Sequence, residues 1–192
     1  MADAGYGSFN NYLYCEGHGI KKDEVNLAFT PHATSKLSEI EDLDSKALEK
    51  ARAEYKAVHP RLADEVDTWD DMELLCRAGV ANKGKLTRAA ILLLGKPTSI
   101  HFIHPAVATV TWVLVDEHDE KVDYEHFTIP FLLTVDDALS KIRNLNQRIL
   151  PGGTLFPDIV KQYDEYSIRE ILHNCIAHQD YTLQERITMV ET

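Results

Sequence analysis

The sequence predicts an α+β fold with a helical N-terminal half, followed by a small antiparallel sheet on which helices pack. Three observations lead to this prediction. Segments between residues 44 and 95 carry apolar residues at helical spacing between capping residues. Residues 106–115 are β-branched, aromatic and apolar on both faces, which is typical of a central strand. Residues 135–150 and 166–181 then return to helical spacing.

The composition limits the classes of function that the chain can have. Its 192 residues carry a formal net charge of −11, and such an acidic chain repels nucleic-acid phosphate. This argues against a large DNA-binding surface but not against a small local one. The cysteines, Cys15, Cys76 and Cys175, lie far apart, so we expect no disulfide framework and a reducing, cytoplasmic location. No apolar run approaches the length of about 18–20 residues that a membrane span needs, so we expect no membrane partner.

The N-terminal region begins with an irregular arm, residues 1–22, and a short half-buried strand, residues 24–30. Asp44 or Ser45 then caps a helix that runs to about Val58. The sequence after this helix predicts two shorter helices.

The first short helix carries acidic residues in its first turn and closes at Gly79. Its inward side chains are expected to be Met72, Leu75 and Cys76. Residues 82–85 form a turn, and Thr87 caps a second helix from Arg88 to Leu94, which Gly95 closes.

These two helices resemble half of a helix-turn-helix unit, for which two interpretations stay open. In one, the unit contacts DNA through Lys83, Lys85 and Arg88. In the other, it is a packed helical hairpin. The second is favoured, because residues 91–94 are too apolar for an exposed reading helix and few positive charges lie nearby.

The C-terminal half predicts a β-hairpin and a long helix. Residues 106–115 and 122–129 are its strands, and 116–120 the turn between them. Thr134 is expected to cap a helix from Val135 to about Leu150. The predicted inner face of this helix consists of Val135, Leu139, Ile142, Leu145 and Ile149. Beyond it we expect a break at residues 151–153 and a short connector over residues 155–160.

The chemistry of the chain is concentrated in the helix predicted over residues 166–181, which has two faces. The apolar stripe consists of Ile168, Ile171, Leu172, Cys175 and Ile176. Glu170, Asn174 and His178 lie four residues apart and form a second stripe. Together they offer a proton acceptor, a metal-ligating oxygen and a donor to phosphate. On spacing alone, the simpler interpretation is a solvated face. Residues 186–190 then look like the first strand of a sheet that the chain does not complete.

Two motifs resemble those of a known bacterial family. They are Lys85-Leu-Thr-Arg-Ala-Ala-Ile-Leu-Leu-Leu-Gly95 and the pattern Tyr166-x-x-Arg-Glu-x-x-x-Asn-x-x-x-His-x-Asp-Tyr181. The family comprises RecG-related ATP-dependent helicases and predicted transcriptional regulators. Its members combine a Schlafen/Alba-type N-terminal domain, a middle region and a GHKL-type ATP-binding domain. The resemblance covers about residues 25–190 and is limited to the middle region and the start of the ATPase domain.

The resemblance implies roles for individual residues. Glu170 would be the base that positions or activates the attacking water, and Asn174 would ligate Mg²⁺ beside the phosphates. His178 matches the His-x-Asp-Tyr ending of the family's motif, and Arg169 would pair with a neighbouring acid or with phosphate. The Asp-x-Gly and Gly-rich lid segments of such domains lie beyond Thr192. The isolated chain is therefore expected neither to bind Mg-ATP tightly nor to hydrolyse it.

The expected organisation has four parts. They are the arm (1–22), a mostly helical region (23–97), a hairpin plus helix (98–160), and the opening helix and strand of a truncated GHKL-like domain (161–192). The preferred function is a fragment of an ATP-binding, DNA-associated transcriptional regulator that contacts DNA through other domains. One alternative is an ATP hydrolase or helicase-like enzyme in the longer protein. Another is a protein-interaction or dimerisation module that forms a homo-oligomer.

Overall fold

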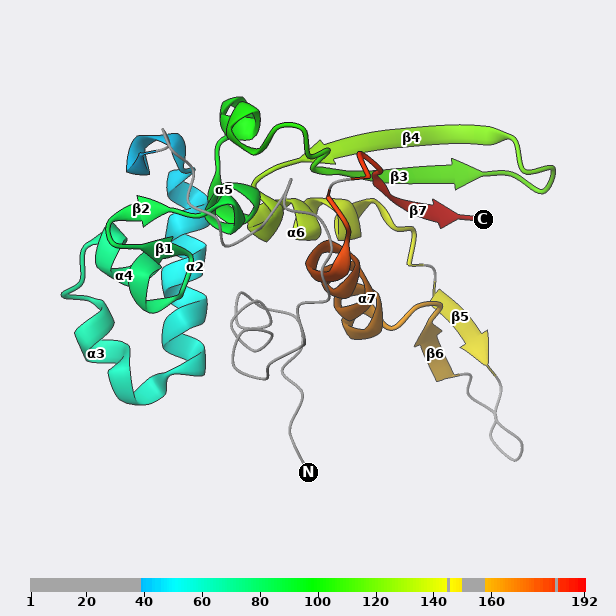
Figure 1. The fold of residues 1–192 in the computed structure, drawn as a ribbon. Helices are drawn as coiled ribbons and strands as arrows, with labels where there is room; N and C mark the ends of the chain where they lie inside the picture. Colours follow the sequence, from blue (N-terminus) through cyan, green and yellow to red (C-terminus); the bar gives the residue numbers. More distant parts are fainter. Residues whose placement is uncertain (1–38, 145, 150–157, 182) are drawn as a thin grey trace.

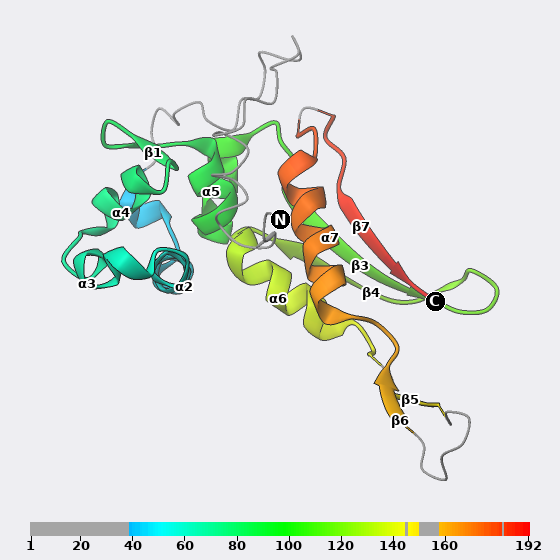
Figure 2. The same ribbon diagram turned by 90° about the horizontal axis from the view of Figure 1, so that it is seen from below.

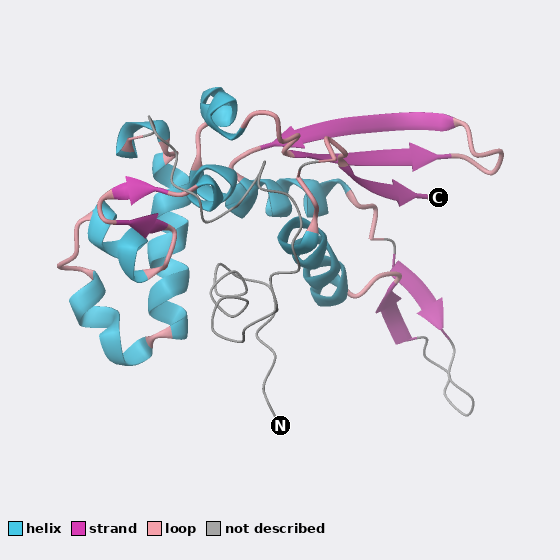
Figure 3. Ribbon diagram, in the orientation of Figure 1, coloured by secondary structure: helices cyan, strands magenta, loops and turns pink. Residues whose placement is uncertain are grey.

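The computed structural model describes residues 39–144, 146–149, 158–181 and 183–192. Within them the predicted α+β class is confirmed: helices form one half, and a sheet with packed helices forms the other (Figures 1 and 3). The predicted arm (1–22), the strand (24–30) and the break (151–153) lie outside the described residues.

The α-helices are α2 (Ser45–Val58), α3 (Ala63–Val66), α4 (Asp71–Arg77), α5 (Arg88–Leu94), α6 (Phe131–Lys141) and α7 (Glu165–His178). Short 3-10 turns form η1 (Ile40–Asp42), η2 (Pro60–Leu62) and η3 (Pro97–Ile103). The strands are β1 (Ala81–Asn82), β2 (Lys85–Leu86), β3 (Thr109–Val115), β4 (Lys121–Thr128), β5 (Asn146–Ile149), β6 (Asp158–Lys161) and β7 (Ile187–Glu191).

Three helices of the N-terminal half begin at a side chain that caps them: Asp44 and Thr87 are caps as predicted, and Asp70, predicted in the first turn of its helix, is a cap too. The Asp44 carboxylate accepts hydrogen bonds of 2.9 and 3.0 Å from the first-turn amides of α2. The Asp70 carboxylate accepts one from Glu73 in α4, and the Thr87 hydroxyl accepts one from Ala90 in α5. These side chains satisfy amides that have no partner inside their own helix, and so they fix where the helices start.

The inward face of α4 differs in part from the prediction. Leu75 is buried as expected and Met72 packs against the core, but Cys76 is exposed and Leu74 is buried in its place. In a helix of 3.6 residues per turn, Leu74, Leu75 and Ala78 share one side, and Cys76 points away from it.

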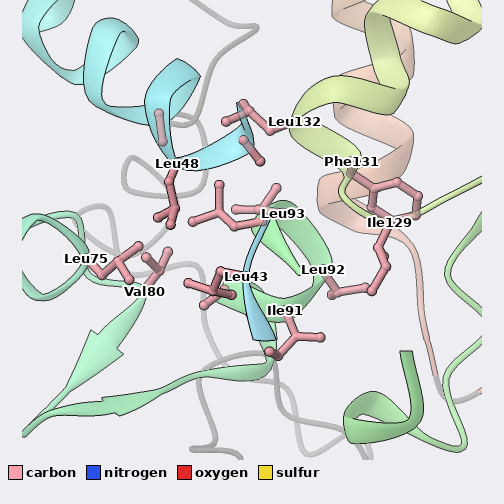
Figure 4. Packing of buried hydrophobic residues seen from close by; sticks show 14 of the residues in the cluster. Leu43, Leu48, Leu75, Val80, Ile91, Leu92, Leu93, Ile129, Phe131 and Leu132 are labelled. Carbon is pink, nitrogen blue, oxygen red and sulfur yellow. The ribbon is translucent and has the colours of Figure 1, made fainter. Parts of the chain in front are cut away.

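Helix α5 is the centre of the core. All of its residues from Ala89 to Leu94 are buried. In Figure 4 its Ile91, Leu92 and Leu93 lie between side chains of the helical half, such as Leu48, and those that precede or begin α6, such as Phe131. The turn predicted over residues 82–85 joins β1 to β2, so a small β-hairpin separates α4 from α5. The structure thus contains the packed arrangement and not an exposed reading helix.

The main sheet has the order β4-β3-β7, so β3 is central, as predicted. β3 begins at Thr109, three residues later than expected, and pairs antiparallel with β4. The strand predicted over residues 186–190 is present one residue later, at 187–191, but β7 does not start another sheet. It pairs parallel with β3, with Val110 opposite Ile187 and Val113 opposite Val190, so the sheet is mixed.

The predicted helix over 135–150 is wrong at both ends. α6 begins at Phe131, and Thr134 lies inside it, where its hydroxyl donates to the Thr128 carbonyl instead of capping. α6 ends at Lys141, because residues 146–149 pair antiparallel with residues 158–161. The same pairing places residues 158–160 of the expected connector in β6. Pairing between distant segments overrides the local helical pattern here.

Helices α6 and α7 cover one face of the main sheet, and the β5–β6 ribbon projects away from both (Figures 1 and 2). α7 leads directly into β7, so it is the connection that returns the chain to the sheet beside β3. This arrangement places the side of α7 that carries Ile168, Ile171 and Cys175 next to β7.

Candidate functional site

Helix α7 begins at a strong capping residue. The Asp164 carboxylate accepts hydrogen bonds from the backbone and the hydroxyl of Ser167, and these bonds lower the pKa of Asp164. The helix ends at His178. Beyond it, the buried Tyr181 hydroxyl donates to the Ile176 carbonyl at 2.8 Å, and burial raises the pKa of this phenol. Both ends of the helix are therefore held by side chains close to them in the sequence, Asp164 before the helix and Tyr181 after it.

Only one edge of the predicted apolar stripe reaches the core. Leu172 and Ile176 are each 2% exposed, whereas Ile171 is 62% exposed. Ile168 is half-buried and Cys175 is exposed. The five residues do lie on one side of the helix, but α7 is rotated so that the edge with Ile171 and Cys175 borders a groove and not the core.

The polar stripe is brought together in part. The Asn174 carboxamide donates to Glu170 Oε1 at 3.2 Å, and the hydrogen-bonded pair is partly buried. Glu170 Oε2 is buried and has no hydrogen-bond partner among the residues described. His178 lies at the end of the helix. A buried carboxylate oxygen without a partner is energetically unfavourable, so this oxygen is suited to accept from a ligand or to hold a water.

Arg169 lies beside Glu170 in the sequence but points elsewhere. Its guanidinium donates to the carboxylate of Asp136 in α6, which also accepts from Lys50 in α2. Burial of Asp136 raises its pKa, but the hydrogen bonds from Lys50 and Arg169 outweigh this and hold the pKa below its usual value. In this arrangement Arg169 joins helices and does not face the polar stripe.

His173 is absent from the site residues that the sequence predicts. It lies one turn after Arg169 and is half-buried, and its Nδ1 is enclosed without a partner among the described residues. Burial and, to a smaller extent, the positive charges of Arg169 and Lys50 lower the pKa of His173 to about 4, against the opposing effect of Asp136. The sequence signal was its four-residue spacing from Arg169, which puts both side chains on one side of α7.

A groove of about 280 Å³ lies between α7 and the sheet. Its mainly apolar lining includes Trp112, Ile142, Ile168, Ile171, Cys175 and Met189. At one end lies the Glu191 carboxylate, which accepts from the Trp112 indole at 3.0 Å and from Arg143 Nε at 2.9 Å. Glu170, Asn174 and His178 lie on the same helix but are not among the residues that line the groove.

The candidate DNA-contacting residues lie elsewhere. Lys83 and Lys85 are exposed on the β1–β2 hairpin, and Arg88 is half-buried in the first turn of α5. Figure 1 places this hairpin on the far side of the helical half from α7. The structure therefore groups these cations with one another and separates them from Glu170 and Asn174.

Metal clusters and membrane-spanning helices are both absent from the described part of the chain. Across residues 39–144, 146–149, 158–181 and 183–192, no group of three or more His, Cys, Asp and Glu side chains is placed to hold a metal ion. Within the same residues, no helix has both the length and the apolar character that crossing a bilayer requires.

Comparisons with known proteins match part of the chain to a domain family and most of it to the fold of a solved structure. Residues 32–110 match a family model described as a domain of unknown function, DUF8451. No curated protein matches the chain. Among solved structures, the chain is similar to the DIP2311 protein from Corynebacterium diphtheriae, with 18% sequence identity and a TM-score of 0.60. The match covers 93% of this chain and 33% of that one, so the chain spans about a third of that structure's length.

Proposed function

We propose that α7 contributes one wall of a Mg-ATP site in an ATP-binding, DNA-associated bacterial regulator, and that this chain is a non-enzymatic part of it. The observation that carries the proposal is the partly buried pair Glu170 and Asn174 on α7, the helix that also forms one wall of the apolar groove. An adenine ring requires an apolar slot, and the phosphates with Mg²⁺ require oxygen ligands nearby. The sequence resemblance assigns Asn174 to Mg²⁺ and Glu170 to the attacking water.

The chemistry of the pair fits a magnesium nucleotide. The Asn174 carbonyl oxygen can ligate a hard cation while its amide group donates to Glu170. The buried Glu170 Oε2 is an acceptor that can hold and orient a water molecule. His178, one turn later at the end of the helix, would donate to phosphate. Arg169 is engaged by Asp136, so its role in the proposal is to position α7.

We expect this chain alone to bind Mg-ATP weakly and not to turn it over. Its net charge of −11 opposes the negatively charged nucleotide. Tight phosphate binding needs converging backbone amides or cations. In the family that the sequence resembles, Asp-x-Gly and Gly-rich lid segments supply these groups. Turnover by the 192-residue chain that disappears in Glu170→Ala would overturn this expectation.

The test is calorimetric titration of Mg-ATP into this chain and into one longer by about 100 residues, roughly a small domain. We expect binding by the longer chain and a loss of at least about tenfold in Asn174→Ala. Glu165→Gln is the matched control, because Glu165 is an exposed carboxylate on the same helix that pairs with Lys161. The nucleotide proposal is contradicted if neither chain binds Mg-ATP. It is also contradicted if Glu165→Gln loses as much affinity as Asn174→Ala.

The longer protein would contact DNA through other domains and work in the cytoplasm, where its scattered cysteines stay reduced. Lys83, Lys85 and Arg88 are the local candidates for a DNA contact in this chain. If they make one, binding to duplex DNA weakens as salt rises and is lost when all three are replaced. In the longer protein, an ATP hydrolase or helicase-like activity with Glu170 as base is the alternative to pure nucleotide binding.

A second candidate function is an interaction or dimerisation module. It is favoured by the apolar side chains exposed around β7, where Ile171 is 62% and Val190 61% exposed. Exposed apolar clusters of this kind mark protein contacts. Light scattering coupled to size exclusion distinguishes the two: a homo-oligomer that Ile171→Ser dissociates supports the module, and a monomer at all concentrations opposes it.

A further inference from the structure

The rotation of α7 about its axis is not the one that apolar burial alone would favour. With about 100° between successive residues, Leu172 and Ile176 lie at one edge of the apolar stripe, and Ile171 and Cys175 lie at the other. The structure buries the first pair and leaves Ile171 62% exposed. Burial alone would turn the helix until the middle of the stripe faced the sheet. The contacts of α7 with α6, on the side of the buried pair, therefore help to set its orientation.

One of these contacts is an ion pair on the side of α7 that faces α6. Arg169 follows the buried edge of the stripe around the helix and donates to Asp136. Turning the helix toward the middle of its stripe would carry Arg169 away from Asp136 and break this ion pair. His173 lies one turn later on the same side, half-buried and next to the same charges.

Asp136 is itself held from the opposite direction. Lys50 in α2 donates to the other carboxylate oxygen of Asp136 and, at 2.8 Å, to the Leu132 carbonyl in α6. Each oxygen of the carboxylate therefore has a cationic partner, one from α2 and one from α7. The Asp136 side chain is 45% exposed, so the pairs are partly screened, but the carboxylate is fixed in position by both.

We propose that Asp136 is a positioning residue that sets the rotation of α7 through Arg169 and ties this rotation to α2 through Lys50. Because Glu170 is the residue next to Arg169, any turn that breaks the ion pair moves Glu170 and Asn174 by the same angle. This consequence for nucleotide binding rests on the proposed function. The rotation itself does not, and it can be measured without any nucleotide.

Cys175 reports the rotation, because it lies on the exposed edge of the stripe. In Asp136→Asn the helix turns toward the sheet and covers this thiol. We expect its alkylation by iodoacetamide, followed by peptide mass spectrometry, to slow by about tenfold. Cys76 is exposed in α4 and serves as the internal standard in the same sample. Loss of a negative charge would by itself favour the thiolate and speed the reaction, so the expected sign is opposite to a direct electrostatic effect.

Three further variants complete the test. Asp136→Glu keeps the charge and should restore the wild-type rate at Cys175. Glu125→Gln removes another ion pair of α6, to Lys141, and should leave the rate unchanged. Arg169→Gln removes the other partner of the ion pair and should slow the alkylation of Cys175 as Asp136→Asn does. If circular dichroism shows that Asp136→Asn is unfolded, Arg169→Gln provides the test in its place. A folded variant lacking the Asp136–Arg169 pair whose Cys175 reacts at the wild-type rate or faster overturns the proposal and leaves the nucleotide proposal untouched.

Discussion

The indole nitrogen of Trp112 in β3 donates a 3.0 Å hydrogen bond to the carboxylate of Glu191 in β7. The same carboxylate accepts from the backbone nitrogen and Nε of Arg143, at 3.1 and 2.9 Å. Its side chain is 6% exposed. One acidic group therefore joins two parallel neighbouring strands to the segment that follows α6, and it closes one end of the groove.

Glu191→Ala should destabilise the protein by about 2–3 kcal/mol, because it leaves a buried indole N–H and the Arg143 amide without their acceptor. Urea unfolding followed by tryptophan fluorescence measures the change. Glu191→Gln is the matched variant: it keeps an acceptor oxygen and should lose about half as much. A cost below about 0.5 kcal/mol in the alanine variant would mean that water replaces the carboxylate there.

Two glycines should respond differently to the same substitution. A Cβ on Gly95 would lie 2.5 Å from the Ile91 carbonyl oxygen, so Gly95→Ala must shift the end of α5 inside the core. We expect a loss of about 2 kcal/mol or more. Gly84 has a φ of +74°, and no atom lies within 4 Å of the place that an alanine methyl would take, so Gly84→Ala should lose only about 1 kcal/mol. Chemical denaturation of both variants tests the order, and a reversed order contradicts the packing at Gly95.

Much of the fold follows from local signals. Asp44 and Thr87 mark helix starts because a cap involves only residues within one turn. The prediction that Thr134 caps a helix is wrong, because its hydroxyl donates to the Thr128 carbonyl, which lies outside the helix. The helical pattern beyond Lys141 failed for a similar reason, since Asn146–Ile149 gains its partner strand from residues 158–161.

In the candidate site, too, contacts within one helix could be predicted from the sequence and contacts between helices could not. The contact between Glu170 and Asn174 follows from four-residue spacing on one helix. The Asp136–Arg169 pair joins residues 33 positions apart and depends on how α6 packs against α7. No periodicity in the sequence reports that packing. The sequence therefore predicted which residues share a face of α7, but not the rotation of the helix or the burial of His173.

His173 should make stability depend on pH. Its pKa is lowered to about 4 in the folded protein, against 6.5 for the free side chain, so the unfolded chain binds the proton first as pH falls. The folded state therefore loses stability between pH 6.5 and 4, by about 2 kcal/mol for a group that is partly in contact with solvent. Unfolding free energies of wild type and His173→Gln across this range isolate the contribution. Parallel curves for the two proteins would contradict it.

Glu170→Gln should stabilise the protein while weakening the proposed site. The Glu170 carboxylate keeps one oxygen buried without a partner among the described residues, and its other oxygen accepts from Asn174. Glutamine retains the acceptor for Asn174 and removes the charge, which lowers the desolvation penalty. We expect the free energy of unfolding to rise by about 0.5–1 kcal/mol. Such a rise is typical when the replaced residue serves function at some cost in stability. Thermal unfolding measures the gain, and Glu165→Gln, at an exposed position on the same helix, should show none. A Glu170→Gln protein less stable than wild type would mean that the carboxylate has a stabilising partner and is a structural group.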